Sequence, residues 1–225
     1  MSKNKKMLLI YVFMLTIGQL LIVAIISGVE ALGSKTGRPL ITEVSGLLFT
    51  NIAVYLLLLI AVCLLFGSEL QKEWQQEKKK IVVQIVKYGM VFLVLGIVVA
   101  RMAEWLEIPT TSNQETLIQM IGVADLFTGI IIIGIAGPII EEIIFRYIIM
   151  EKICIYGKKR AVIISSVLFG MIHLDGFSFA ELFIYTLLGV YLGVIYNKTK
   201  KITVSIGVHC FYNLVNVLLV YILAT

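Results

Sequence analysis

Charged residues are scarce in this chain. Only 15% of its 225 residues are Asp, Glu, Lys or Arg, whereas an average soluble domain has about 25%. Hydrophobic residues make up 60% of the chain and the mean hydropathy is +1.00. The strict apolar–polar alternation of a membrane barrel strand is also missing, and the apolar runs are continuous. These absences exclude a soluble domain and a β-barrel, and they indicate a polytopic membrane protein whose helices satisfy their own backbone groups.

Cysteine and histidine are rare as well. The three cysteines, Cys63, Cys154 and Cys210, are odd in number and far apart, which excludes a disulfide framework or a thiolate metal cluster. We interpret them as small apolar packing residues. The only two histidines are His173 and His209, and no HExxH motif is present to offer two zinc ligands from one helix. No repeat or low-complexity segment divides the chain, so residues 1–225 are predicted to form a single domain.

The apolar runs predict an all-α transmembrane bundle of about seven spans, with eight as the alternative. Basic residues fill the connector at 72–80, and residues 101–125 are predicted to be a loop or an interfacial segment. The predicted spans lie at about 7–32, 46–67, 81–99, 127–150, 161–173, 179–196 and 202–223.

The basic residues predict the orientation of this bundle. With a cytoplasmic N-terminus, fourteen Lys and Arg residues fall in inside segments and three in outside loops, as the positive-inside rule requires. The net charge of +5 is therefore interpreted as a topology signal, with the lipid bilayer and not nucleic acid as partner. The inside residues are Lys3, Lys5, Lys6, Lys72, Lys78, Lys79, Lys80, Lys152, Lys158, Lys159, Arg160, Lys198, Lys200 and Lys201, and the outside residues are Lys35, Arg38 and Arg101.

The fourth predicted span carries charges that folding does not need. Glu141, Glu142 and Arg146 lie within a run of Ile, Gly, Ala and Phe. Each ionised group near mid-bilayer costs about 2.5–3.5 kcal/mol on insertion scales, so a functional site is the default interpretation. Pro138 precedes these residues and is expected to kink the helix and make room for water.

Helix geometry predicts which of these side chains pair and which point in different directions. Glu142 and Arg146 are spaced i, i+4 with the acid first, which favours an intrahelical ion pair. Adjacent helical residues diverge by about 100°, so Glu141 and Glu142 are expected not to face the same partner, leaving Glu141 to point into a cavity. His209 and Asn213 are also spaced i, i+4 and share one helix face.

Each feature also has a structural explanation. A buried Glu–Arg pair can hold helices together, a histidine at a span end is often interfacial, and an asparagine in a span often bonds a neighbouring helix. Intramembrane Glu and His groups can also serve a proton-coupled transporter, although no inverted repeat is present. The concentration of these groups in otherwise apolar spans favours one shared site.

Three motifs in order, Glu141-Glu142-x-x-x-Arg146, Phe169-x-x-x-His173 and His209-x-x-x-Asn213, give the chain a family resemblance. The chain resembles the CPBP family of intramembrane proteases, the CAAX proteases and bacteriocin-processing enzymes that are also called the Abi family. The resemblance covers about residues 127–220, which would form the catalytic core. Residues 1–120, the variable N-terminal spans, match only as apolar spans. Tyr147 departs from the Gly that many members have.

The resemblance implies a role for each motif residue. Glu141 with His173 would activate a water for attack on a peptide carbonyl. His209 and Asn213 would stabilise the developing oxyanion, which is usually the greatest single contribution to acyl-transfer catalysis. Three further residues would orient these groups or pack beside them: Glu142, Arg146 and Phe169.

The residues leave the question of a metal open. Glu141, His173 and His209 would make a three-ligand zinc site with an open position. The better-studied relatives look glutamate-dependent without bound metal, and no HExxH motif is present. The favoured expectation is that no cofactor is required, with zinc as the alternative.

The predicted function is an intramembrane endopeptidase, a multi-pass protein of a bacterial plasma membrane. Its substrate would be a membrane-associated peptide or protein, such as a leader peptide, a bacteriocin or signalling-peptide precursor, or a toxin-receptor component. The alternative is a non-proteolytic protein, either a bacteriocin self-immunity factor or a membrane scaffold.

Overall fold

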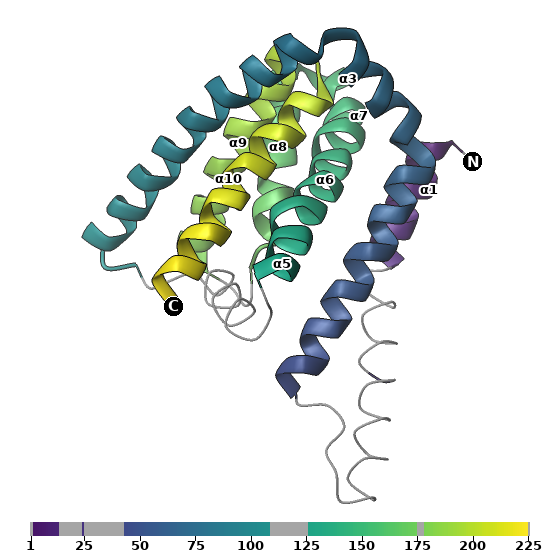
Figure 1. Ribbon diagram of the computed structural model, residues 1–225. Coiled ribbons are helices and arrows are strands. Elements are labelled where there is room, and N and C mark those ends of the chain that lie inside the picture. Colours follow the sequence, from purple (N-terminus) through teal and green to yellow (C-terminus); the bar gives the residue numbers. More distant parts are fainter. Residues whose placement is uncertain (1, 14–23, 25–42, 109–125, 175–177, 225) are drawn as a thin grey trace, which may run out of the picture.

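A computed structural model describes residues 2–13, 24, 43–108, 126–174 and 178–224 (Figure 1). Every secondary-structure element in these ranges is a helix, as predicted. The helices are α1 (Lys3–Phe13), α3 (Glu43–Trp105), α5 (Leu126–Gly129), η2 (Ile130–Ala136), α6 (Gly137–Glu142), η3 (Ile143–Met150), α7 (Glu151–Ile153), η4 (Cys154–Tyr156), α8 (Lys158–Met171), α9 (Phe179–Thr199) and α10 (Ile202–Ala224).

Helix α3 is one bent helix that joins two of the predicted spans. Its 63 residues would extend about 95 Å if straight, roughly three times the hydrocarbon core of a bilayer. The helix breaks at Glu77, where φ is −137° and ψ is 31°. Figure 1 shows the two arms, 43–76 and 78–105, on opposite sides of the bundle. The predicted connector at 72–80 is thus helical, because Lys, Glu and Gln are good helix formers.

Within the described residues, four segments are long and apolar enough to cross a membrane: Ile52–Trp105, Leu126–Met150, Phe179–Thr199 and Ile202–Leu223. The first of these contains most of the second predicted span and all of the third. Helix α8, the fifth predicted span, has 14 residues and is shorter than the others. The first predicted span lies mostly outside the described residues, as does 109–125. The number of seven spans and the cytoplasmic N-terminus therefore remain predictions.

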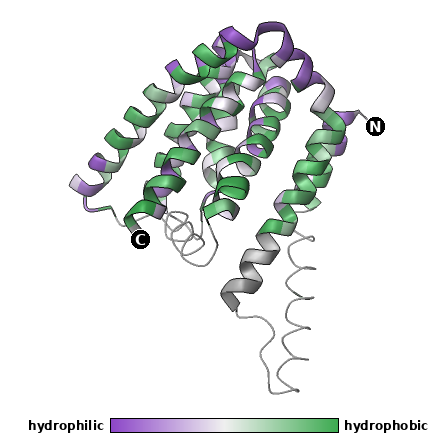
Figure 2. Ribbon diagram, viewed as in Figure 1, coloured by the Kyte–Doolittle hydropathy of each residue, from purple (hydrophilic) through white to green (hydrophobic). Residues whose placement is uncertain are grey.

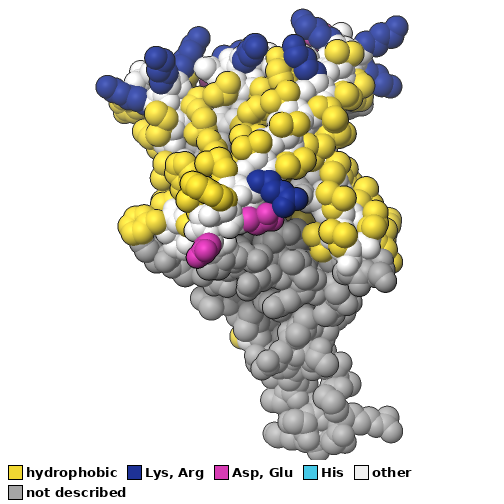
Figure 3. Space-filling model, turned by 90° about the vertical axis from the view of Figure 1, so that its left-hand side faces the viewer, with side chains coloured by type: hydrophobic (Ala, Val, Ile, Leu, Met, Phe, Trp, Pro, Cys, Tyr) yellow, Lys and Arg dark blue, Asp and Glu magenta, His cyan; other side chains and the backbone are white. Residues whose placement is uncertain are grey.

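Polarity is divided along the long axis of the bundle. Hydrophilic residues cluster at the bend of α3, while the helix bodies are hydrophobic (Figure 2). Figure 3 shows most Lys and Arg side chains of that face gathered at the same end, above a broad hydrophobic surface. This distribution is what the positive-inside rule expects of a cytoplasmic end.

The consecutive helices α5, η2, α6 and η3 form one continuous helical segment, residues 126–150, which is called the rod below. The rod lies between the other helices and carries the charged motif. It contains two π-helical stretches, η2 and η3, on either side of α6. More than half of its apolar window is buried inside the described structure, the largest share among the four candidate spans. Helix α6, with Pro138 in its first turn, therefore presents Glu141 and Glu142 to the interior of the bundle.

Helices α8 and α9 approach closely through small residues. A Cβ on Gly189 would lie 3.2 Å from Ser166 Cα, and a Cβ on Gly193 would lie 3.3 Å from Val162 Cγ1. Small residues at such spacing let helix backbones meet in a membrane. The packing places the end of α8, and with it His173, against α9.

Candidate active site

Glu142 is fully buried. Its Oε1 lies 3.3 Å from Arg146 Nη1, which confirms the predicted i, i+4 ion pair. Its Oε2 accepts a hydrogen bond of 2.5 Å from Ser205 Oγ of α10. Its Oε1 also lies 3.0 Å from His209 Nδ1. The carboxylate therefore links its own helix to α10 through two side chains.

His209 lies between the two adjacent carboxylates. Its Nδ1 meets Glu142, and its Nε2 lies 3.8 Å from Glu141 Oε2. The expectation that the two acids cannot face one partner is therefore wrong. An imidazole carries a nitrogen on each of two edges, so one ring can contact two carboxylates that diverge from their helix.

Arg146 has no exposed surface and is held from several sides. Its Nη2 donates to the carbonyl of Gly189 on α9 over 3.0 Å. Its guanidinium carbon lies 4.4 Å from the centre of the Phe169 ring, a cation–π distance. Arg146 thus connects the rod to both α8 and α9, and Phe169 packs beside the charged cluster as the sequence predicted.

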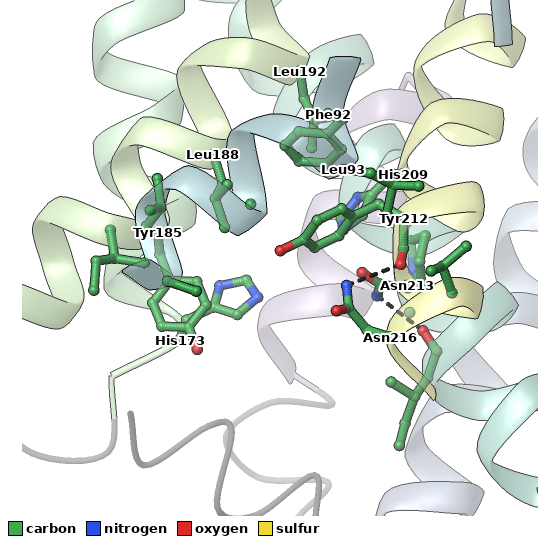
Figure 4. Close-up of a pocket in the computed structure, with 18 of the residues that line it drawn as sticks. Phe92, Leu93, His173, Tyr185, Leu188, Leu192, His209, Tyr212, Asn213 and Asn216 are labelled. Atoms are coloured by element: carbon green, nitrogen blue, oxygen red, sulfur yellow. Dashed lines mark hydrogen bonds between the residues drawn. The ribbon is translucent and has the colours of Figure 1, made fainter. Parts of the chain in front are cut away.

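His173 lies two residues beyond the end of α8 at Met171, and its ring lies between two aromatic side chains. Its Nδ1 lies 2.8 Å from the carbonyl oxygen of Phe169, so in the tautomer that donates this bond Nε2 has a free lone pair. Tyr185 of α9 stacks on it at 4.7 Å and 18°, and the Phe169 ring is 4.5 Å away. Figure 4 shows the His173 ring directed into the pocket from the side of Tyr185.

Asn213 is held by a backbone carbonyl of η2 that lacks its usual hydrogen-bond donor within the helix. In η2 the N–H of Gly137 donates to Ile132, five residues back. The same pattern would assign the N–H of residue 138 to Ile133, but proline has no N–H. Asn213 Nδ2 donates to that carbonyl instead, over 3.0 Å. The predicted effect of Pro138 therefore takes the form of a π-helical turn with an open acceptor, a feature common at functional sites.

The four predicted catalytic side chains line one cavity of about 730 Å³. Glu141 comes from α6, His173 from the end of α8, and His209 and Asn213 from α10. Figure 4 shows His173 on one side of this space and Asn213 on the other. In the described residues, no ion pair within 4.0 Å joins Glu141 to His173, whereas His209 Nε2 lies 3.8 Å from Glu141. A cavity of this size lies in the range of small-ligand sites.

The zinc alternative would need three donor side chains to meet at one point. Among the described residues, no three His, Cys, Asp or Glu side chains come together closely enough to hold a metal ion. All three proposed ligands, Glu141, His173 and His209, belong to the described residues. The Nδ1 of His209 is already paired with Glu142.

Four residues of this region were not singled out by sequence. Ser205 precedes His209 by one helical turn, so the two share a face of α10, and both contact Glu142. Asn216 follows Asn213 by three residues and lines the same cavity. Tyr55 and Tyr185 line it from α3 and α9, and no sequence spacing relates them to the motifs.

Residues 123–215 match the family model described as "Type II CAAX prenyl endopeptidase Rce1-like". This region of the chain is Rce1-like. The matched range contains all seven predicted site residues, so the resemblance to CAAX-type peptidases that the three motifs predicted is confirmed there. No solved structure matches the chain.

Three relatives also match. "Putative membrane peptidase YdiL" of Bacillus subtilis is 38% identical over 106 residues, which cover 46% of this chain and 41% of the relative. "UPF0177 protein YxdF" of Lactococcus lactis is 40% identical over 83 residues, covering 37% of this chain and 45% of the relative. An uncharacterized protein of Mycoplasma capricolum is 22% identical over 193 residues, covering 80% and 56%. The chain thus spans about half the length of the curated relatives it matches.

Proposed function

We propose that the chain is an intramembrane endopeptidase that hydrolyses a peptide bond of a membrane-associated peptide or protein in a bacterial plasma membrane. The observation that supports this most is the convergence of the Glu141 carboxylate, two imidazoles and an amide around one cavity inside an apolar bundle. A second carboxylate, Glu142, lies behind one of those imidazoles, that of His209. The Rce1-like match over the same residues supports the same chemistry. The catalytic core is assigned to residues 127–220 of a single membrane domain.

The proposed reaction begins with water between Glu141 and His173. Glu141 takes a proton from the water as its oxygen attacks the substrate carbonyl carbon, and the Nε2 lone pair of His173 orients the water. The carbonyl oxygen becomes an oxyanion. When the tetrahedral intermediate collapses, the carbon–nitrogen bond breaks and the proton held by Glu141 passes to the leaving amine.

His209 and Asn213 are placed to stabilise that oxyanion. In its imidazolium form, His209 donates Nδ1–H to Glu142 and directs Nε2–H toward the cavity, and the two carboxylates beside it balance its charge. Asn213 uses one amide hydrogen on Ile133, and a second remains for the oxyanion. Removing one such donor typically reduces kcat by about 10²–10³.

No step of this proposal uses a metal ion. A purified preparation in detergent micelles is therefore expected to keep its full rate of peptide cleavage after dialysis against excess EDTA. A loss of activity that added zinc restores would contradict this part of the proposal.

The substrate can be found by comparing membrane peptides of cells that carry the wild-type chain or Glu141→Gln. The variant keeps the shape of the side chain and removes the base, so an uncut peptide is expected to accumulate. Glu181→Gln, an acid of α9 outside the cavity lining, is the matched control and should behave like the wild type. Identical peptide profiles for wild type and Glu141→Gln would favour the non-proteolytic immunity or scaffold role instead.

A further inference from the structure

Helix α10 continues its polar face beyond the proposed catalytic residues. His209, Asn213 and Asn216 are spaced i, i+4 and i+7, and all three line the cavity. Figure 4 shows Asn216 beside Asn213 and facing His173 across the pocket. At 1.5 Å per residue, Asn216 lies about 4.5 Å further along the helix than Asn213. This offset lies between one and two residues of an extended peptide, each about 3.3 Å.

The two asparagines are bonded in different ways. The amide of Asn213 joins α10 to the carbonyl of Ile133 on the neighbouring rod. The amide nitrogen of Asn216 donates over 3.0 Å to the carbonyl of Tyr212, one turn back on its own helix. Among the described residues, that hydrogen bond links Asn216 to no second helix. A polar side chain at membrane depth is costly, and this one is not explained by helix–helix packing.

Part of the cavity wall is apolar. Phe92 and Leu93 line the cavity from the second arm of α3, and Leu188 and Leu192 line it from α9 (Figure 4). An extended peptide in such a space would have its own N–H and C=O groups away from water, at a cost of several kcal/mol for each group left unpaired. An asparagine amide offers both a donor and an acceptor, which is what one peptide unit needs.

We propose that Asn216 binds the main chain of an apolar peptide segment held extended in this cavity, about one to two residues from the bond that is cut. The proposal rests on the proposed function and adds its substrate class: a segment of aliphatic side chains whose backbone, and not a charged group, is recognised. The aliphatic and aromatic walls would hold the side chains while Asn216 sets the register.

Binding can be measured without cleavage. The chain carrying Glu141→Gln, in detergent micelles, is titrated with a fluorescein-labelled decapeptide of alternating leucine and alanine, and anisotropy gives the Kd. Adding Asn216→Leu, which keeps the side-chain volume, is expected to raise the Kd by about fivefold, the effect of one lost hydrogen bond. Asn197→Leu, an asparagine of α9 outside the cavity lining, is the matched control and should leave the Kd unchanged.

A backbone-modified peptide identifies the interacting group. Replacing the central amides by esters removes main-chain donors, so it should weaken binding to the parent and have a smaller effect on the Asn216→Leu chain, as in a double-mutant cycle. Three results would overturn the proposal: no saturable binding to the parent, an unchanged Kd in Asn216→Leu, or an ester effect that is absent or equal in both chains. Failure of the proposed function is detected separately, by a wild-type chain that cuts no peptide.

Discussion

Glu142 connects the charged residues of the rod to α10. It pairs with Arg146 on its own helix and with Ser205 and His209 on α10. The contact with Nδ1 of His209 fixes which edge of the ring faces Glu141. Glu142 is therefore a positioning residue for the proposed oxyanion donor as well as a partner for a buried guanidinium.

Replacing Glu142 by alanine tests both roles. The change leaves Arg146 charged, buried and unpaired, so the free energy of unfolding should fall by about 3–5 kcal/mol. Thermal unfolding in detergent, followed by circular dichroism, measures this. Adding Arg146→Met should restore much of the stability because no charge is then left unpaired, while cleavage stays low because His209 has lost its partner. An unaltered unfolding midpoint for Glu142→Ala would contradict the assignment.

At this scale the sequence predicted contacts within a helix better than contacts between helices. The Glu142–Arg146 pair followed from i, i+4 spacing alone and is present. The position of His209 between both acids depends on how α10 packs on the rod, which no local spacing specifies. The contact of Ser205 with Glu142 was missed for the same reason, since an isolated serine in an apolar run carries no signal.

The contact between α8 and α9 controls where His173 lies. A Cβ on Gly170 would lie 2.7 Å from Thr186 Oγ1 and 3.1 Å from both the carbonyl oxygen of Leu182 and the nitrogen of Thr186. Two of these neighbours are backbone atoms of α9 and cannot rotate away. His173 lies about one helical turn after Gly170, and its backbone N–H donates a hydrogen bond to the carbonyl of Gly170. Any separation of the two helices at Gly170 would therefore move the imidazole.

Gly170→Ala is expected to lower stability by about 1–3 kcal/mol, the usual cost of overpacking. It should also reduce the cleavage rate several-fold by displacing His173 from Glu141. Thermal unfolding and a peptide-cleavage assay on the same preparations measure the two effects. Gly67→Ala is the matched control, because a Cβ there meets nothing within 4 Å, and it should be neutral or slightly stabilising. Equal behaviour of the two variants would contradict the close-packing argument.

The helices themselves were largely predictable, whereas their internal geometry was not. The fifth predicted span at 161–173 corresponds to α8 at 158–171, because the apolar run has clear polar limits. The kink expected at Pro138 is realised as η2, with the open carbonyl that Asn213 bonds. A π-helical turn leaves no pattern in hydropathy, so only the position of the irregularity was predictable.

At the scale of the whole molecule, side-chain contacts connect the helices at the basic end of the bundle, near the bend of α3. Glu77 at the break of α3 pairs with Lys201 over 2.9 Å, and Glu73 accepts hydrogen bonds from the backbone and hydroxyl of Thr203. Lys3 of α1 pairs with Glu69. These contacts join α3 to the starts of α1 and α10 at the end where the positive-inside rule expects the cytoplasm.

Cysteine labelling tests this orientation. In a chain whose three cysteines are replaced by alanine, Lys79→Cys lies at the bend of α3, and Leu106→Cys lies just after its other end. An impermeant maleimide should label Leu106→Cys in intact bacterial cells and Lys79→Cys only after permeabilisation. The opposite pattern would reverse the topology.

The sequence predicted the class of the molecule but not the way its spans are joined. Continuous apolar runs identified a helical membrane protein, and motif order identified the Rce1-like region. The second and third predicted spans form one bent helix, because the connector at 72–80 is itself helix-forming. Glu77, where the helix breaks, pairs with Lys201 beside the start of α10, and no single segment predicts such a contact between segments.

The most direct test of the central claim is a double-mutant cycle at the cavity. The substrate identified in cells is offered to purified wild type, Glu141→Gln, His173→Ala and the double variant, and kcat/KM is measured for each. If Glu141 and His173 act on one water, each single variant should lose at least about 10³-fold, and the double variant should lose little more, as expected for residues that work as a unit. Single variants that keep most of the activity, or losses that simply multiply in the double variant, would contradict a shared hydrolytic site.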